Sequence, residues 1–186
     1  MTATEYLTSE QVILVDDNDR EIGTAEKLSA HQHNLLHRAF SIFIFKDQPP
    51  YPLLLQQRSL HKYHSPGLWT NTCCSHPRLG ETLLAAGERR LFEEMGLRCA
   101  LKNVGRFHYI AHFDNGLSEN EIDHVLIGLV PADILISPNP QEVHTYRWIT
   151  LPELEQTLRE HPEQFTPWLL KALEIVKAQP FPLNLK

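Results

Sequence analysis

The alternation of apolar and polar positions predicts several strands in the first third of the chain. The segment VILVDD (12–17) is a short apolar run that enters a turn, as a strand does. In RAFSIFIFKD (38–47) apolar residues occupy successive positions, which is typical of a central strand covered on both faces. The tract QPPYP interrupts that run, and PLLLQQRS (52–59) is its expected hairpin partner.

The run TLLAAGERRLFEEMG (82–96) predicts a helix in the middle of the chain. Leu84, Leu91 and Met95 recur at i, i+7 and i+11, so we expect them to form its apolar face. Glycine commonly ends a helix because it adopts the left-handed conformation without strain. The helix is therefore expected to end at Gly96.

The second half of the chain predicts further strands and two closing helices. The expected strands are 105–113, 122–131 and 145–150, with a loop at 114–120 between the first two, and the expected helices span 151–161 and 165–178. This order is typical of an α+β fold or mixed α/β sandwich, in which helices flank a mixed sheet. No linker divides the chain, so residues 1–186 are expected to form a single domain.

Composition narrows the classes of protein further. Seventeen Lys and Arg against 23 Asp and Glu give a net charge of −6, which disfavours nucleic acid but allows a small anionic substrate held by a few cations. No apolar run approaches the ~20 residues of a membrane helix. The opening MTATEYLTSE has neither the basic nor the apolar region of a secretory signal. With three cysteines, an odd number, we expect reduced thiols in a cytoplasmic protein. We also expect a monomer.

The segment SHPRLGETLLAAGERRLFEEMGL (75–97) resembles the Nudix box, G-x5-E-x7-R-E-U-x-E-E-x-G-U, in which U is aliphatic. The matching residues are Glu81, Arg89, Leu91, Glu93, Glu94, Gly96 and Leu97. Two positions depart from the pattern, because Ser75 replaces the first glycine and Arg90 replaces a glutamate.

The substitution at Arg90 changes what such a helix is expected to do. In Nudix hydrolases the helix glutamates hold the magnesium that activates a diphosphate, since hard cations prefer carboxylate oxygens. A guanidinium at this position adds a donor for diphosphate and removes a metal ligand. Arg90 and Glu94 are four apart and share a helix face, so we expect diphosphate on Arg90, one Mg²⁺ on Glu94 and poor hydrolysis. The alternative is an ordinary solvated helix with a charged face.

Thiols and candidate metal ligands gather in other segments. TNTCCSHP (70–77) carries two adjacent cysteines and a histidine. The histidine and carboxylate candidates are His31, His33, His37, His76, Glu119 and Glu121. On an extended strand, two carboxylates two residues apart point to one face. Three imidazoles and two carboxylates would suit zinc, manganese or magnesium. Any one histidine is more often a surface or hydrogen-bonded residue, so the residues alone do not show which histidines take part.

Together these segments resemble type 1 isopentenyl diphosphate isomerase, a family of isoprenoid biosynthesis with the Nudix fold. The resemblance covers nearly the whole chain and rests on EKLSAH (26–31), LLHRAFSIFIF (35–45), LLLQQRS (53–59), PGLWTNTCCSHPRLGE (66–81), GERRLFEEMG (87–96), ENE (119–121) and FTPWLL (165–170). TNTCCSHP and ENE are the most specific pieces, and Arg90 is how this family departs from the hydrolases. The resemblance implies interconversion of isopentenyl and dimethylallyl diphosphate by a 1,3-allylic proton shift, through a tertiary carbocation.

The resemblance also implies a role for each matching residue. It implies Cys74, Glu121 and Tyr109 as catalytic residues; His31, His37, His76, Glu119 and Glu121 as ligands of one divalent metal (Mn²⁺, Mg²⁺ or Zn²⁺); Lys27, Arg58, Lys62 and Arg90 as diphosphate ligands; Trp168 as the aromatic face for the cation; and Glu94 as the ligand of a Mg²⁺ that accompanies the diphosphate. Cys73 is expected to be a small buried residue. A thiol and a carboxyl group suit this reaction, because protonating an unactivated alkene needs a strong proton donor on one face and a base on the other.

Other functions remain as alternatives. A Nudix hydrolase of a nucleoside diphosphate derivative would release phosphate, although Arg90 removes one metal ligand from its box. A structural zinc domain would use Cys73, Cys74 and His76, although adjacent cysteines lack the usual C-x2-C spacing. A cysteine peptidase would pair Cys74 with a histidine, but no peptidase signature surrounds it.

Overall fold

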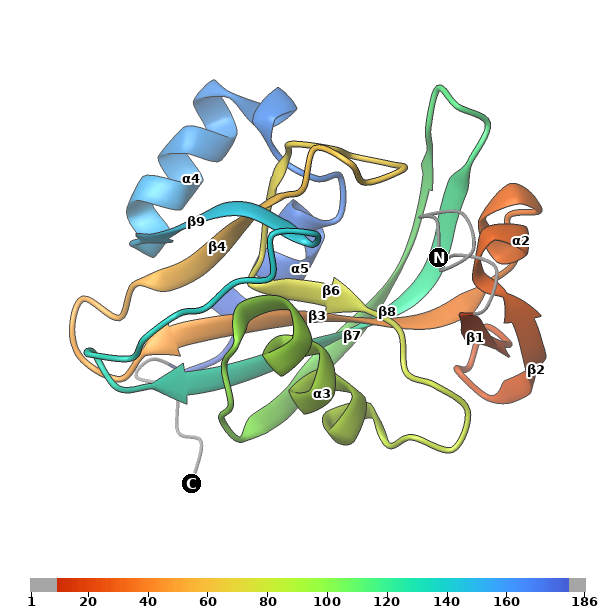
Figure 1. Cartoon of the computed structure of the whole chain (residues 1–186), viewed down its shortest axis with the longest axis horizontal. Helices are drawn as coiled ribbons and strands as arrows, with labels where there is room; N and C mark the ends of the chain where they lie inside the picture. The colour runs from red at the N-terminus through yellow and green to blue at the C-terminus, as the bar shows by residue number, and fades with distance from the viewer. Residues whose placement is uncertain (1–9, 181–186) are drawn as a thin grey trace.

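The structure is a computed structural model that describes residues 10–180. Residues 1–9, on which the expected lack of a secretory signal rests, lie outside the described residues. The strands are β1 Gln11–Val15, β2 Glu21–Glu26, β3 His37–Lys46, β4 Leu53–Arg58, β5 Trp69–Thr70, β6 Cys73–Ser75, β7 Leu101–His112, β8 Ser118–Val130 and β9 Val143–Ile149. The helices are α2 Lys27–Gln32, α3 Leu83–Met95, α4 Leu151–Glu160 and α5 Leu169–Lys177, with a 3-10 turn η1 at Pro162–Gln164 (Figure 1).

Strand β3 is the central strand of the sheet, as predicted. Along one edge it pairs in parallel with β8 over its whole length, from His37 to Lys46. Its other edge is divided among β1 at its start, β6 in the middle and β4 at its end. The expected hairpin partner β4 therefore meets β3 at a single pair, Phe45 with Leu53, and then diverges to pair with β9.

Thr72 bridges β3 and β4 where they diverge. Its backbone N–H donates to the Ile42 carbonyl, and its hydroxyl accepts from the Ile44 N–H. The same hydroxyl donates to the Leu54 carbonyl on β4 at 2.6 Å. Because these backbone groups are buried, each needs a partner, and Thr72 supplies it. The hydrogen bonds of Thr72 thus stabilise the divergence of β4 from β3.

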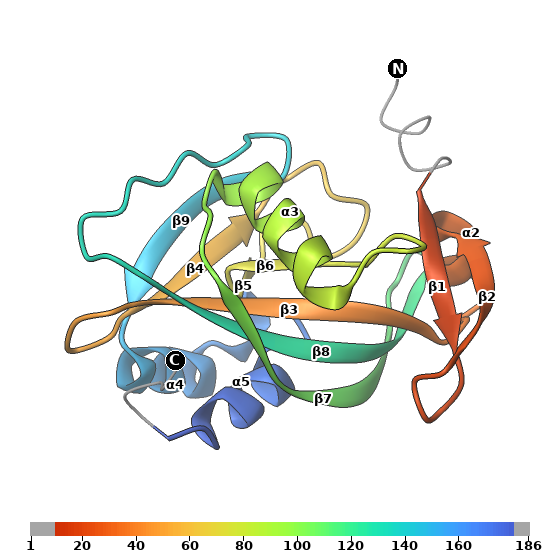
Figure 2. The same ribbon diagram turned by 90° about the horizontal axis from the view of Figure 1, so that it is seen from below.

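The sheet has a helix layer on each face, which confirms the predicted α+β class. Figure 2 shows α3 on one side of the sheet and α4 with α5 on the other. Alternation along β3 sends Ile42 and Ile44 to the core beside α3, and Phe43 and Phe45 to the core beside α5. None of the helices within residues 10–180 combines the length and apolar character needed to cross a membrane.

Helix α3 ends where predicted but presents a different face. Gly96 follows its last residue with φ +67°, in the left-handed region. Leu91 and Met95 are buried, whereas Leu84 is 40% exposed, so its expected place on the apolar face is wrong. The helix is rotated because its buried side also carries Gly87, where a Cβ would lie 2.8 Å from a Leu126 methyl. The periodicity of apolar residues does not reveal that a glycine lies on the buried face, so it predicts the wrong face for Leu84.

Other expected boundaries also need correction. The loop predicted at 114–120 is shorter, because β8 already begins at Ser118 and contains both acidic residues of ENE. The helix predicted from 165 begins at Leu169, since Phe165 forms a β-bridge with Trp69. Strands β2, β5 and β6 and helix α2 were not predicted; each spans only two to six residues.

Replacing Gly96 by alanine should destabilise the fold by roughly 1–3 kcal/mol, since positive φ strains a residue with a Cβ. That Cβ would also lie 2.7 Å from the Ser137 carbonyl oxygen. Urea denaturation measures the change. Gly116→Ala is the matched control, because Gly116 has φ +80° but open space around it. Equal losses in the two variants would contradict the close contact.

Candidate active site

The site is built around the first residue of β3. His37 lies opposite Glu121 in the parallel pairing of β3 with β8, and Glu121 lies opposite Tyr109 in the antiparallel pairing of β8 with β7. The three side chains therefore form a row across three strands. All three are buried. The Tyr109 hydroxyl donates to Oε2 of Glu121 at 2.9 Å.

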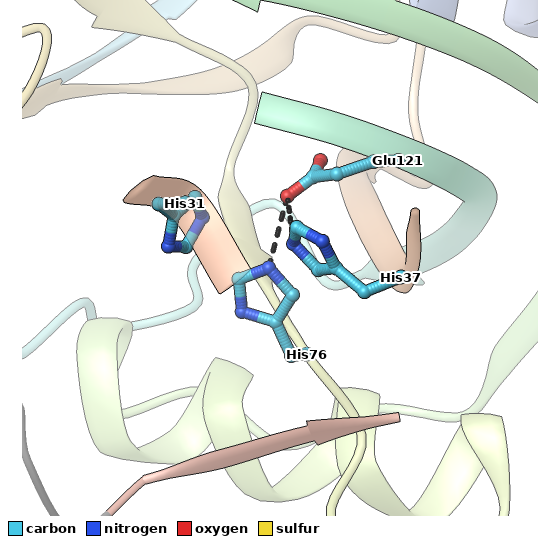
Figure 3. Close-up of side chains that lie close together, drawn as sticks. All are labelled: His31, His37, His76 and Glu121. Carbon is cyan, nitrogen blue, oxygen red and sulfur yellow. Dashed lines mark hydrogen bonds and ion pairs between the residues drawn. The ribbon is translucent and has the colours of Figure 1, made fainter. Parts of the chain in front are cut away.

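Two further histidines reach Glu121 and His37 from other elements. His31 lies on the short helix α2, which Glu26 caps by accepting from the N–H groups of Leu28 and Ser29. His76 directly follows β6, and its Nε2 lies 2.9 Å from Oε1 of Glu121. One ligand atom from each of the three histidines and Glu121 lies within 4.8 Å of the others. Figure 3 shows the three rings gathered at the Glu121 carboxylate.

The free nitrogens of this cluster fit a divalent cation. Nδ1–H of His31 donates to the Lys27 carbonyl at 2.8 Å, and Nδ1–H of His37 donates to the Leu35 carbonyl at 2.8 Å. A backbone carbonyl behind the ring fixes the tautomer and leaves Nε2 as a free lone pair, the arrangement of metal-binding histidines. Both Nε2 atoms are buried and neither makes a hydrogen bond among the described residues, although that of His37 lies 3.3 Å from Oε1 of Glu121. Buried polar atoms normally have a partner, so a bound cation would supply the one that these nitrogens lack.

Electrostatics also favours ligand forms of these side chains. Burial, together with His76 and His37, lowers the pKa of His31 to about 3, so its imidazole is neutral at physiological pH. Burial alone would raise the pKa of Glu121, but the neighbouring rings of His37 and His76 bring it well below its usual value. Neutral imidazoles and an ionised carboxylate are the forms that bind metals.

The structure groups Glu119 with other partners. Oε2 of Glu119 accepts from the Tyr109 hydroxyl, and Oε1 lies 3.2 Å from Nε2 of His64. Burial and the neighbouring Glu121 raise the pKa of Glu119 to about 8. Glu119 is therefore beside the four-residue cluster and not within it, and its role as a fifth ligand stays a prediction. His64, which stacks on Phe113 with ring centroids 4.9 Å apart, was not expected from the sequence.

The two adjacent cysteines face opposite sides of the sheet. Cys73 is fully buried in the core beside α3, where it packs with Ile42 and Leu91. Cys74 faces the other side, and its Sγ accepts from Nε1 of Trp168 at 3.1 Å. Burial raises the pKa of Cys74 to about 12, so it is a thiol at neutral pH. In the part of the chain that the structure describes, no cysteine joins a cluster of three or more metal-type ligands, which leaves the zinc-domain alternative unsupported.

Ser41 and Asp123 lie beside the Cys74 thiol and were not anticipated. Ser41 pairs with Cys74 across β3 and β6, with Oγ 3.6 Å from Sγ. The same hydroxyl donates to Oδ2 of Asp123 at 2.7 Å. Alternation along β8 from Glu119 through Glu121 indicates a third acid on the same face, so a sequence signal for Asp123 existed. The contact of Ser41 depends on the register of β6, which the sequence does not reveal.

The predicted diphosphate ligands meet at the same cavity. Its lining includes Lys27, Arg58, Lys62 and Arg90, together with Cys74, Tyr109, Glu121 and Trp168. Arg58 lies 5.5 Å from the centre of the Trp168 ring, and its guanidinium donates to the carbonyls of His64 and Ser65. Glu94 lies behind Arg90, where it accepts from that guanidinium and from Nε2 of Gln56.

Known proteins with the same fold include members of the NUDIX family. The NUDIX domain model matches residues 35–169. The crystal structure of DR0079 from Deinococcus radiodurans is similar with a TM-score of 0.67 and 17% identity, over 90% of this chain and 98% of that one. A MutT NUDIX hydrolase from Burkholderia pseudomallei has a TM-score of 0.59 and 20% identity, over 76% of this chain and 98% of its own. The fold and the match define a NUDIX-domain protein.

Curated relatives narrow this class. An isopentenyl-diphosphate Delta-isomerase of Photobacterium profundum is 48% identical over 91% of this chain and 96% of its own. Another, from Burkholderia multivorans, is 50% identical over 86% of this chain and 88% of its own. The chain belongs to the isopentenyl-diphosphate Delta-isomerase family.

Replacing His31 by alanine should weaken binding of Mn²⁺ or Zn²⁺ at least about tenfold, since even partners behind a ligand contribute that much. Calorimetric titration of the metal-free protein measures the affinity, and circular dichroism checks the fold. His33→Ala is the control, because His33 is exposed and two residues away. Unchanged affinity in His31→Ala would exclude this cluster as the metal site.

Proposed function

We propose that the protein interconverts isopentenyl and dimethylallyl diphosphate. The observation that carries the proposal is one cavity lined by the Cys74 thiol, the Glu121 carboxylate and four cationic side chains. The substrate has an alkene, which needs the proton-transferring thiol and carboxylate, and a diphosphate head group, which needs the cations. The names and high identity of the curated relatives support the same activity.

The reaction requires one proton to be added and another to be removed. A C–H bond forms at one end of the allylic unit and a C–H bond breaks at the other, so no oxidant or reductant is needed. Cys74 and Glu121 differ strongly in pKa, which lets one hold a proton while the other lacks it. Either group can donate in one direction and accept in the other. Tyr109, hydrogen-bonded to Glu121, orients that carboxylate.

Trp168 is the group best suited to stabilise the intermediate carbocation. Its side chain is buried and held by hydrogen bonds from Nε1 to Cys74 Sγ and Asn71 Oδ1. An aromatic face attracts a desolvated cation by ~2 kcal/mol or more. Because the ring is fixed beside the thiol, the positive charge would develop between an aromatic face and a proton acceptor.

The charged residues have separate roles in this proposal. Lys27, Arg58, Lys62 and Arg90 bind the diphosphate, and Glu94 holds the Mg²⁺ that accompanies it. His31, His37, His76 and Glu121, with Glu119 beside them, hold one divalent cation, Mn²⁺, Mg²⁺ or Zn²⁺. When bound, that cation would supply positive charge that stabilises the ionised Glu121 carboxylate. The Nδ1 hydrogen bonds of His31 and His37 keep their rings in the ligand tautomer.

The alternative of nucleotide hydrolysis is disfavoured by Arg90. This residue stands where the Nudix box has a glutamate, and its guanidinium pairs with both Glu93 and Glu94. The substitution therefore removes one carboxylate from the set that a hydrolase would use for metal binding and leaves Glu94 for a single Mg²⁺.

The purified protein with Mg²⁺ and Mn²⁺ should convert isopentenyl diphosphate into its dimethylallyl isomer. Proton nuclear magnetic resonance distinguishes the two alkenes directly. A parallel incubation with nucleoside diphosphate derivatives should release no phosphate above background. Phosphate release without isomerisation would establish the hydrolase instead.

The two adjacent cysteines provide a matched pair of variants. Cys74→Ala should lower kcat by ~10²–10⁴, as expected for loss of a positioned acid or base. Cys73→Ala removes a buried sulfur on the far side of the sheet and should leave kcat within about threefold of the wild type. Near-normal turnover in Cys74→Ala, or the larger loss in Cys73→Ala, would overturn the assignment.

A further inference from the structure

The diphosphate pocket already contains an internal anion. The carboxylate of Glu142 pairs through Oε2 with the ammonium of Lys62 and through Oε1 with the guanidinium of Arg90 at 3.4 Å. Lys62 lies in the loop after β4 and Arg90 lies on α3, and both line the cavity. A single carboxylate thus occupies two of the four cations assigned to the substrate's head group.

The backbone holds Glu142 firmly at this position. The Asn139 N–H donates to the Glu94 carbonyl at the end of α3, at 2.8 Å. The Ser59 N–H, just after β4, donates to the Glu142 carbonyl at 3.0 Å, and the Glu142 N–H donates to the Asn139 carbonyl. The turn is therefore fixed between α3 and the loop after β4, the two segments that supply the cations. Burial alone would raise the pKa of Glu142, but Lys62 and Arg90 lower it, so the carboxylate is ionised.

Most cations of the pocket have a carboxylate partner when no ligand is bound. Within the described chain, Lys27 pairs with Glu10, Lys62 pairs with Glu142, and Arg90 pairs with Glu93, Glu94 and Glu142. The Arg58 guanidinium donates to backbone carbonyls instead. Three of the four cations thus already have a carboxylate partner. A bare diphosphate, with about three negative charges, gains little net attraction from such a set, because like charges at short range repel strongly in a partly buried site.

The available space indicates the same competition. The cavity measures about 50 Å³. Ligand pockets commonly have about 300–1,000 Å³, so this pocket is largely filled by its own side chains. A ligand must draw Lys62 and Arg90 away from their present partner, at least in part. A divalent cation bound to the diphosphate would reduce the repulsion that follows.

We propose that Glu142 is a specificity-determining residue that excludes metal-free anions and makes binding of diphosphate depend on a divalent cation. This inference rests on the proposed function for the identity of the pocket. Glu142 competes for Lys62 and Arg90, and its negative charge opposes any anion that arrives without a metal. With magnesium on the diphosphate, the same charge is tolerated, because the ligand then carries only about one net negative charge.

Calorimetric titration of inorganic pyrophosphate, with and without Mg²⁺, tests the inference. In Glu142→Gln, metal-free pyrophosphate should bind at least about tenfold more tightly than to the wild type, because one opposing charge is gone. Affinity for magnesium pyrophosphate should change by less than about threefold, so the dependence on magnesium shrinks. Glu142→Asp keeps the charge and should retain the dependence. Glu155→Gln, which breaks the remote pair with Lys177, is the control.

Each other outcome contradicts the inference in a recognisable way. Weaker binding of Glu142→Gln under both conditions would make Glu142 a support for the cations. Weaker binding only with Mg²⁺ would make it a metal ligand. Unchanged binding would show that it has no part in recognition. If the wild type bound no pyrophosphate even with Mg²⁺, the diphosphate pocket and the proposed function would fail together, whereas the preceding outcomes leave that function intact.

Discussion

The site depends on the way one edge of β3 is divided among three strands. If β4 followed β3 throughout, it would occupy the place where β6 brings Cys74 beside Ser41. Thr72 satisfies the backbone and holds the divergence open by bonding both strands. Along the opposite edge, continuous pairing with β8 sets His37 beside Glu121. Strand β3 therefore positions the thiol through one of its edges and the carboxylate cluster through the other.

Burial gives these groups the properties that the chemistry needs. Cys74 lies beside a tryptophan N–H and keeps its proton. Glu121 accepts a hydrogen bond from a tyrosine, lies beside two histidines and loses its own proton. Buried polar groups without partners are costly, so the free nitrogens of His31 and His37 indicate an additional cation. In the head-group region, three of the four cations already have a carboxylate partner. The pocket thus combines a proton-transfer region with a partly neutralised anion-binding region.

Much of the fold could be predicted where periodicity is long. The continuous apolar run of β3 indicated a central strand, and Gly96 marked the end of α3. Short elements such as β6 carry too few residues for a pattern, and Leu84 was misplaced because a close contact at Gly87 rotates the helix. The resemblance supplied residues that the structure gathers at one cavity. Glu142 and Lys62 lie 80 positions apart in the sequence, and no local pattern indicates that two such residues meet.

The central claim is that the enzyme adds a solvent-derived proton to the alkene and removes another. Incubation of isopentenyl diphosphate with the protein in deuterium oxide, followed by nuclear magnetic resonance of the product, tests it most directly. The account predicts dimethylallyl diphosphate that carries deuterium in a methyl group, because the donor exchanges its proton with solvent. Product that contains no deuterium would contradict protonation by an enzyme side chain, as would recovery of unchanged substrate.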